Sequence, residues 1–114
     1  MPESLKMQAF TSIGTTQVTV VGPVSALASL GVAVVGLIIS NVIATAGVTV
    51  DVRVRDSSGA ITGFVVNAAG IPYGQSLEIL GTNQRLILEL NDYITVACST
   101  ANGAGAVASY IENA

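Results

Sequence analysis

In the segment VTVDVRVR, residues Val48–Arg55, apolar and polar side chains alternate without a break. Consecutive side chains of a β-strand point to opposite sides, so this alternation places four valines on one face and polar residues on the other. No helix satisfies a period of two. The segment therefore predicts a strand with one side packed on a core and the other side in water.

The chain carries no charged side chain from Met7 to Val50, the third residue of this strand. Such a span is typical either of a membrane helix or of strands buried on both faces. The most apolar window, Val24–Ala46, contains Ser, Asn, Thr and several Gly, and no basic residue flanks it. Its run VAVVGLIISNV, Val32–Val42, is rich in Val and Ile and predicts a central strand covered on both faces. For residues 24–31 the sequence does not distinguish between a helical turn and a loop.

Turn residues divide the rest of the chain into short apolar runs. Asp56–Gly59 predicts a hairpin turn, Asn67–Gln75 a loop that crosses between sheets, and Asn91–Asp92 a tight hairpin. Further strands are expected at Gln17–Val21, Ala60–Val66, Ser76–Leu80, Arg85–Leu90, Tyr93–Ser99 and Ala106–Ile111. The count of about eight or nine short strands predicts an all-β chain, an antiparallel, jelly-roll-like β-sandwich. We expect residues 1–9 to form a flexible arm and residues 10–114 a single domain, with order beginning near Phe10.

The residue types argue against an enzyme. The chain has no His, which removes the usual base near neutral pH and the commonest metal ligand. Cys98 stands alone in an apolar run and is expected to be a small core residue. The acids are scattered over expected turns and outward faces, and the net charge of -3 leaves no basic surface for nucleic acid. We expect no cofactor, no metal, no nucleic-acid partner and no membrane partner.

The low charge content suggests a contact with another protein. Hydrophobic residues make up 51% of the chain and charged residues 10%, so part of the apolar surface is expected to face a neighbour. For the aromatic residues, capping the ends of the sandwich is the alternative. Our interface candidates are Phe10, Val35, Leu37, Ile39, Tyr73, Ile87 and Tyr110.

Three motifs follow one another along the chain. They are the VTVDVRVRD strand at Val48–Asp56, the IPYGQSL crossing at Ile71–Leu77 and the LILELNDYITV segment at Leu86–Val96. In this order they resemble the motifs of small β-sandwich virion proteins of tailed bacteriophages. The resemblance covers about the last two thirds of the chain and is greatest to the head decoration or cement proteins. The uncharged Val24–Ala46 region is more apolar than the resemblance leads us to expect.

The resemblance implies a non-enzymatic structural protein, made in the host cytoplasm and carried on the capsid exterior of the virion. Its implied partners are the major capsid protein and its own copies, as a homotrimer that stabilises capsomer contacts. A tail fibre or neck module that binds a host glycan through Tyr73 and Tyr110, or another tail protein, is the main alternative. A small membrane protein such as a lysis factor is the third.

Overall fold

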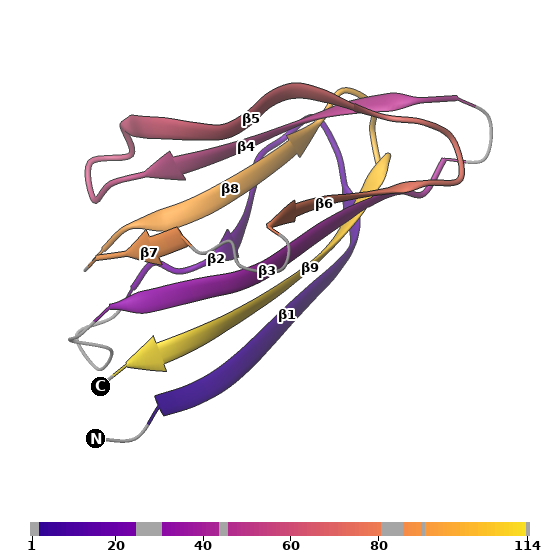
Figure 1. The fold of residues 1–114 in the computed structure, drawn as a ribbon. Helices are drawn as coiled ribbons and strands as arrows, with labels where there is room; N and C mark the ends of the chain where they lie inside the picture. The colour runs from indigo at the N-terminus through magenta and orange to yellow at the C-terminus, as the bar shows by residue number, and fades with distance from the viewer. Residues whose placement is uncertain (1–2, 25–30, 44–45, 81–85, 90, 114) are drawn as a thin grey trace.

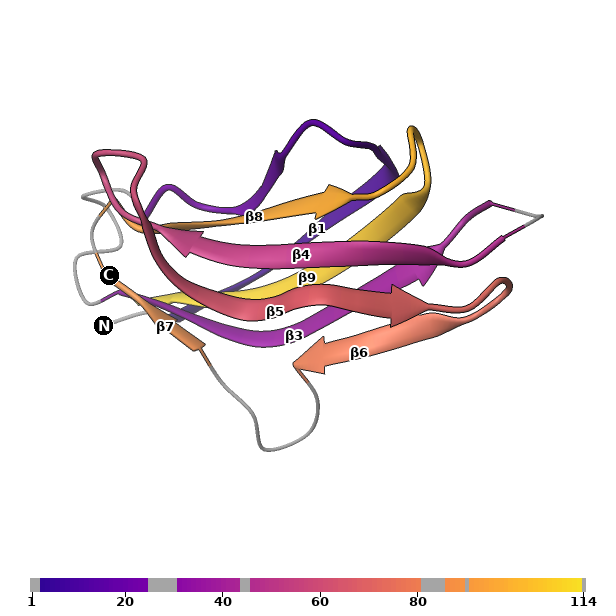
Figure 2. The same ribbon diagram turned by 90° about the horizontal axis from the view of Figure 1, so that it is seen from above.

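The computed structural model describes residues 3–24, 31–43, 46–80, 86–89 and 91–113, and these form two antiparallel sheets packed face to face (Figures 1 and 2). The predictions for residues 25–30, 44–45, 81–85 and Leu90 lie outside the described residues. No helix able to cross a membrane occurs within these ranges. The strands are β1 (Glu3–Ile13), β2 (Val18–Val21), β3 (Val32–Asn41), β4 (Val48–Arg55), β5 (Ile61–Ile71), β6 (Ser76–Leu80), β7 (Leu86–Leu88), β8 (Tyr93–Cys98) and β9 (Ala104–Asn113).

The strand order is that of a jelly roll. One sheet, the β1 sheet, runs β1-β9-β3-β6 with β7 also paired to β3, and the other, the β2 sheet, runs β2-β8-β4-β5. Strands that follow one another in the chain mostly belong to different sheets, and β4–β5 is the hairpin formed around Asp56–Gly59. Two interleaved Greek keys of this kind define the double-sheet jelly roll. The predicted all-β sandwich is confirmed.

The core between the sheets is aliphatic, as the sequence predicts. β3 and β4 each supply alternate residues to it, among them Leu37, Ile39, Val50 and Val52, all almost fully buried. β9 contributes small side chains, Ala104, Ala106 and Ala108. Cys98 is buried among these residues, so its predicted place in the core is confirmed.

The expected arm at residues 1–9 is wrong from Glu3 onward. These residues open β1, which pairs with β9 in eight consecutive positions, from Glu3 opposite Asn113 to Phe10 opposite Ala106. The partner strand lies about a hundred residues away in the chain, so local sequence gives no sign of the backbone hydrogen bonds that order this segment. In Figure 1 both termini lie at the same end of the molecule for this reason.

Two expected connections also differ. The predicted Asn67–Gln75 loop is shorter, because β5 continues to Ile71 through irregular pairing with β4. There the backbone N–H of Ala68, which has a φ of 54°, donates to the Asp51 carboxylate at 2.7 Å. The Asn91–Asp92 turn joins β7 in one sheet to β8 in the other, so it is a crossover rather than a hairpin.

Candidate interaction surface

The outer side of the β1 sheet carries an ordered set of apolar side chains. Residues directly opposite each other in antiparallel strands point to the same side, so the register defines rows across the sheet. One row runs Leu5–Ile111–Ala33–Ile87, the next Met7–Ser109–Gly36, and the third Ala9–Val107–Ile38–Glu78. We call Leu5, Met7, Ala9, Ala33, Ile38, Ile87, Val107 and Ile111 the apolar face.

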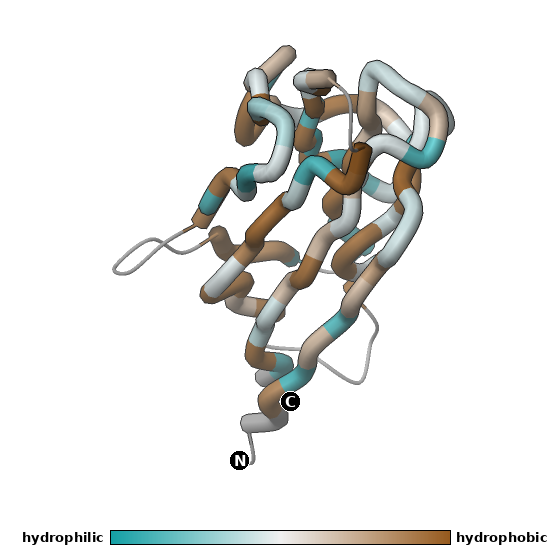
Figure 3. Tube along the Cα trace, turned by 90° about the vertical axis from the view of Figure 1, so that its right-hand side faces the viewer, coloured by the Kyte–Doolittle hydropathy of each residue, from teal (hydrophilic) through white to brown (hydrophobic). Residues whose placement is uncertain are grey.

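Several of these side chains are open to solvent. Leu5 is 79% exposed, Met7 66% and Ile87 62%, and Ile38 and Val107 are about two fifths exposed. Glu78, at the end of the third row on β6, brings the one charge in the three rows. In Figure 3 apolar positions recur along the strands that lead away from the termini. The three rows thus form an apolar outer surface whose one charged residue, Glu78, lies at its edge.

The apolar face explains the continuous apolar run of β3. Alternate residues of β3, including Val34, Leu37 and Ile39, enter the core, while Ala33, Gly36 and Ile38 lie on the outer side. We expected a strand covered on both faces. Within the described residues of one copy only the inner side is covered, because no further layer lies on the outer side of the β1 sheet, and cover of that side by a partner stays a prediction.

The outer side of the β2 sheet is different, since its polar groups bond to one another. The Arg53 guanidinium pairs with Asp51 at 3.3 Å and lies 5.5 Å from the centre of the Phe64 ring. Gln17 Oε1 accepts hydrogen bonds from both Arg55 Nε and Thr95 Oγ1, each at 2.9 Å. The Arg53 Nε atom is buried without a hydrogen-bond partner. The charged half of the β4 pattern therefore forms a polar surface, as its alternation predicts.

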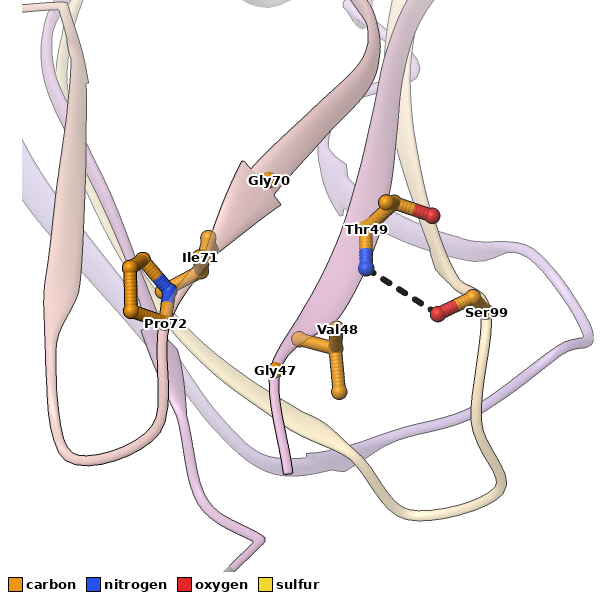
Figure 4. Close-up of a pocket in the computed structure, with 7 residues that line it drawn as sticks. All are labelled: Gly47, Val48, Thr49, Gly70, Ile71, Pro72 and Ser99. Atoms are coloured by element: carbon orange, nitrogen blue, oxygen red, sulfur yellow. Dashed lines mark hydrogen bonds between the residues drawn. The ribbon is translucent and has the colours of Figure 1, made fainter.

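A shallow hollow of about 400 Å³ lies where β4 begins and β5 ends (Figure 4). One hydrogen bond crosses it, from the Thr49 backbone N–H to Ser99 Oγ at 3.0 Å. Among the described residues no charged or aromatic side chain lines it, so these residues offer neither an acid and base pair nor a stacking platform for a sugar. Its lining residues are Gly47, Val48, Thr49, Gly70, Ile71, Pro72 and Ser99.

The predicted interface residues are dispersed. Leu37 and Ile39 are fully buried in the monomer's own core, which leaves no surface for a partner. Phe10 and Tyr110 are partly buried against that core, in keeping with the alternative of aromatic caps. Val35 is half-buried at the irregularity of the β3–β9 pairing. Only Tyr73 and Ile87 are strongly exposed, and of these Ile87 belongs to the apolar face.

Tyr73 and Tyr110 do not form one site. Tyr110 is opposite Val34 near the start of β3, whereas Tyr73 lies in the turn whose Gln75 carbonyl bonds to Asn41, the last residue of β3. A strand rises about 3.3 Å per residue, so the two ends of this stretch are roughly 23 Å apart. A glycan site that needs both rings is not supported.

Sequence reasoning missed most of the apolar face. Leu5 and Met7 fell in the expected arm, and Ile38, Val107 and Ile111 fell in runs with apolar residues on both sides of the strand. One signal was present, because the alternation of Leu5, Met7 and Ala9 with Lys6 and Gln8 has the period of a strand. Among the described residues no group of three or more His, Cys, Asp or Glu is placed to hold a metal ion.

Comparisons with known proteins add little to this geometry. No protein-family model and no curated protein sequence matches the chain. A chain in the structure of infectious bursal disease virus Gx strain aligns with 96% of this chain, at a TM-score of 0.44 and 7% sequence identity. The alignment spans only 31% of that viral chain. The jelly-roll assignment accordingly rests on the strand order itself.

Proposed function

We propose that this protein is a non-enzymatic structural component of a virus particle, a decoration protein that binds the outer surface of the head and stabilises contacts between capsomers. The observation that carries the proposal is the apolar face. The resemblance of the Val48–Val96 motifs to virion proteins of tailed phages supports it. The jelly-roll order is also in keeping with it, since capsid domains commonly use this fold.

The size of the apolar face suits a protein contact. The three rows of the apolar face are about 6.6 Å apart, and the four strands that they cross are about 4.8 Å apart. Together they cover roughly 400 Å². Soluble monomers rarely expose larger continuous apolar patches, and a patch of this size is often functional. Burying it against a shell would stabilise the complex by roughly 10 kcal/mol before the cost of association is subtracted. Repeated over many copies, modest contacts of this kind would resist internal pressure without any covalent bond.

Binding to heads that lack the protein tests the proposal. Purified protein should sediment with such heads, and electron microscopy should show added density on their outer surface. Ile38→Lys places a charge in the middle of the apolar face and should weaken binding at least tenfold. Thr19→Lys is the matched control, because Thr19 is an exposed residue on the β2 sheet. The proposal fails if the wild type does not bind heads or if Ile38→Lys binds as well as Thr19→Lys.

A further inference from the structure

We infer that two copies of this protein associate through β1, by antiparallel pairing of β1 with the same strand of a second copy about a twofold axis at Met7. The inference goes beyond the proposed function, because it concerns the protein free in solution. An edge strand exposes a row of unpaired N–H and C=O groups that can pair with another chain.

β1 is the least protected edge. Within the described part of the chain it pairs with β9 on one side alone, and its run from Glu3 to Phe10 is regular. The β5 edge shifts register against β4 at three places. The remaining edge strands are short, with four residues in β2, five in β6 and three in β7. Edge strands are commonly protected against strand addition by being short or irregular. From Glu3 to Phe10 β1 is neither short nor irregular.

The side chains of β1 also favour a partner. Leu5 and Met7 are the two most exposed large hydrophobic residues among those described. Lys6 lies within 3.8 Å of Glu112, so the single positive charge of this strand is paired within its own copy. A second strand beside β1 would cover both apolar side chains, and the Lys6 ammonium would enter the contact already paired with Glu112.

For a second copy paired with β1, twofold symmetry and charge together favour one pairing register. Antiparallel pairing about a twofold axis makes one residue face its own copy, and the choice of that residue sets the overlap. Axes at Lys6 and at Met7 both pair seven residues of the regular run. An axis at Lys6 places two lysines directly opposite, which is destabilising. An axis at Met7 sets Lys6 opposite Gln8 and Leu5 opposite Ala9, so the apolar faces of the two copies join.

The expected contact is small. Seven paired residues span about 24 Å, and the shortest dimension of the molecule is 21 Å. If the contact has these two lengths as its sides, the two copies together would bury roughly 1,000 Å². This area is the lower limit of a specific interface. The dimer should therefore form in a concentration-dependent way.

Sedimentation equilibrium of the purified protein over a wide concentration range tests the inference, with two matched variants. Wild type should pass from monomer to dimer. Met7→Lys places two lysines opposite each other and should raise the dimer dissociation constant at least tenfold. Ile87→Lys makes the same change at a similarly exposed residue on β7. It should leave the dimer dissociation constant within twofold of the wild-type value. Circular dichroism confirms that both variants fold.

Disulfide cross-linking tests the register, because residues facing each other across a strand pair lie within disulfide range. Met7→Cys should form a covalent dimer on oxidation. Leu5→Cys alone should not, whereas a mixture of Leu5→Cys with Ala9→Cys should. The buried Cys98 stays in place. A protein that is monomeric at every concentration or trimeric, as the resemblance implies, overturns the inference. An equal rise of the dimer dissociation constant in Met7→Lys and Ile87→Lys also overturns it, because that result would indicate a contact through the whole apolar face.

Discussion

Leu5 and Ile87 stand at the two ends of one row of register partners that crosses the β1 sheet through Ile111 and Ala33. They are 82 positions apart in the chain, yet they point to the same side of the sheet and are both strongly exposed. No charged residue interrupts the row. The outer side of the β1 sheet is therefore mainly apolar, whereas the outer side of the β2 sheet carries the Arg53–Asp51 ion pair.

Leu37 and Ile38 are neighbours on β3 that point to opposite sides of the sheet, so alanine substitutions should have different effects. Leu37→Ala removes a fully buried side chain and should lower the free energy of unfolding by about 2–5 kcal/mol. Ile38→Ala removes a side chain that is partly exposed and should cost less than about 1 kcal/mol. Urea denaturation measures both values. Equal losses would contradict the assignment of the inner and outer sides of β3.

Asn41 links three segments at the end of β3 through its buried amide. Its Nδ2 donates to the carbonyl oxygens of Ala46 at 2.8 Å and Ile71 at 3.1 Å, and its Oδ1 accepts from the Ile43 N–H at 2.9 Å. Asn41→Ala leaves these backbone groups without a partner and should lower the free energy of unfolding by about 1–3 kcal/mol.

Ser40→Ala is the control for Asn41→Ala, because the Ser40 hydroxyl bonds at an exposed position to that of Ser76. Ser40→Ala should change the free energy of unfolding by no more than about 0.5 kcal/mol. Chemical denaturation of the two variants gives the comparison. A loss for Asn41→Ala no larger than that for Ser40→Ala would argue against the three-way link.

Gly103 is confined by its neighbours. A Cβ at this position would lie 2.8 Å from the Cys98 Sγ and 2.9 Å from the Thr100 carbonyl oxygen, closer than atoms approach without displacement. Gly103→Ala should therefore reduce stability by about 1–3 kcal/mol. Gly63→Ala, on β5, meets nothing within 4 Å and should change stability by less than about 1 kcal/mol. Thermal unfolding followed by circular dichroism ranks the two variants, and a reversed ranking would refute the packing described here.

The Asp56 turn should show a defined pH dependence. The Ser58 hydroxyl, and then the backbone N–H groups of Ser58 and Ala60, donate to this carboxylate and lower its pKa below the ordinary value of 3.8. A folded-state pKa below the unfolded one stabilises the fold above the unfolded value, and this stabilisation is lost as pH falls through the folded pKa. The stability advantage of the wild type over Asp56→Asn should therefore shrink below pH 3.8.

Ser58→Ala removes the largest cause of that shift. It should move the pKa of Asp56 back toward its ordinary value, which an NMR titration of the carboxyl carbon measures. A pKa unchanged by Ser58→Ala would show that the hydroxyl does not hold the carboxylate.

The elements that sequence predicted well are those whose own pattern is decisive. β4 and β6 have the predicted bounds, β8 ends one residue earlier than predicted, and the Asp56–Gly59 turn closes the β4–β5 hairpin. Elements stabilised by a distant partner were predicted less well. β1 was taken for an arm, and β7 and β8 were joined in one hairpin although they belong to different sheets. Of the predicted interface residues, Ile87 alone lies on the apolar face.

A β-sandwich with an aliphatic core could be predicted from the residues alone, because period-two patterns and turn residues act locally. The scarcity of charge on part of the surface could be predicted in the same way. Which side of β3 faces the core and which strand forms the open edge depended on the three-dimensional fold. Where both sides of a strand are apolar, the side that is buried depends on which layer packs against it, and that layer is made of residues far away in the chain.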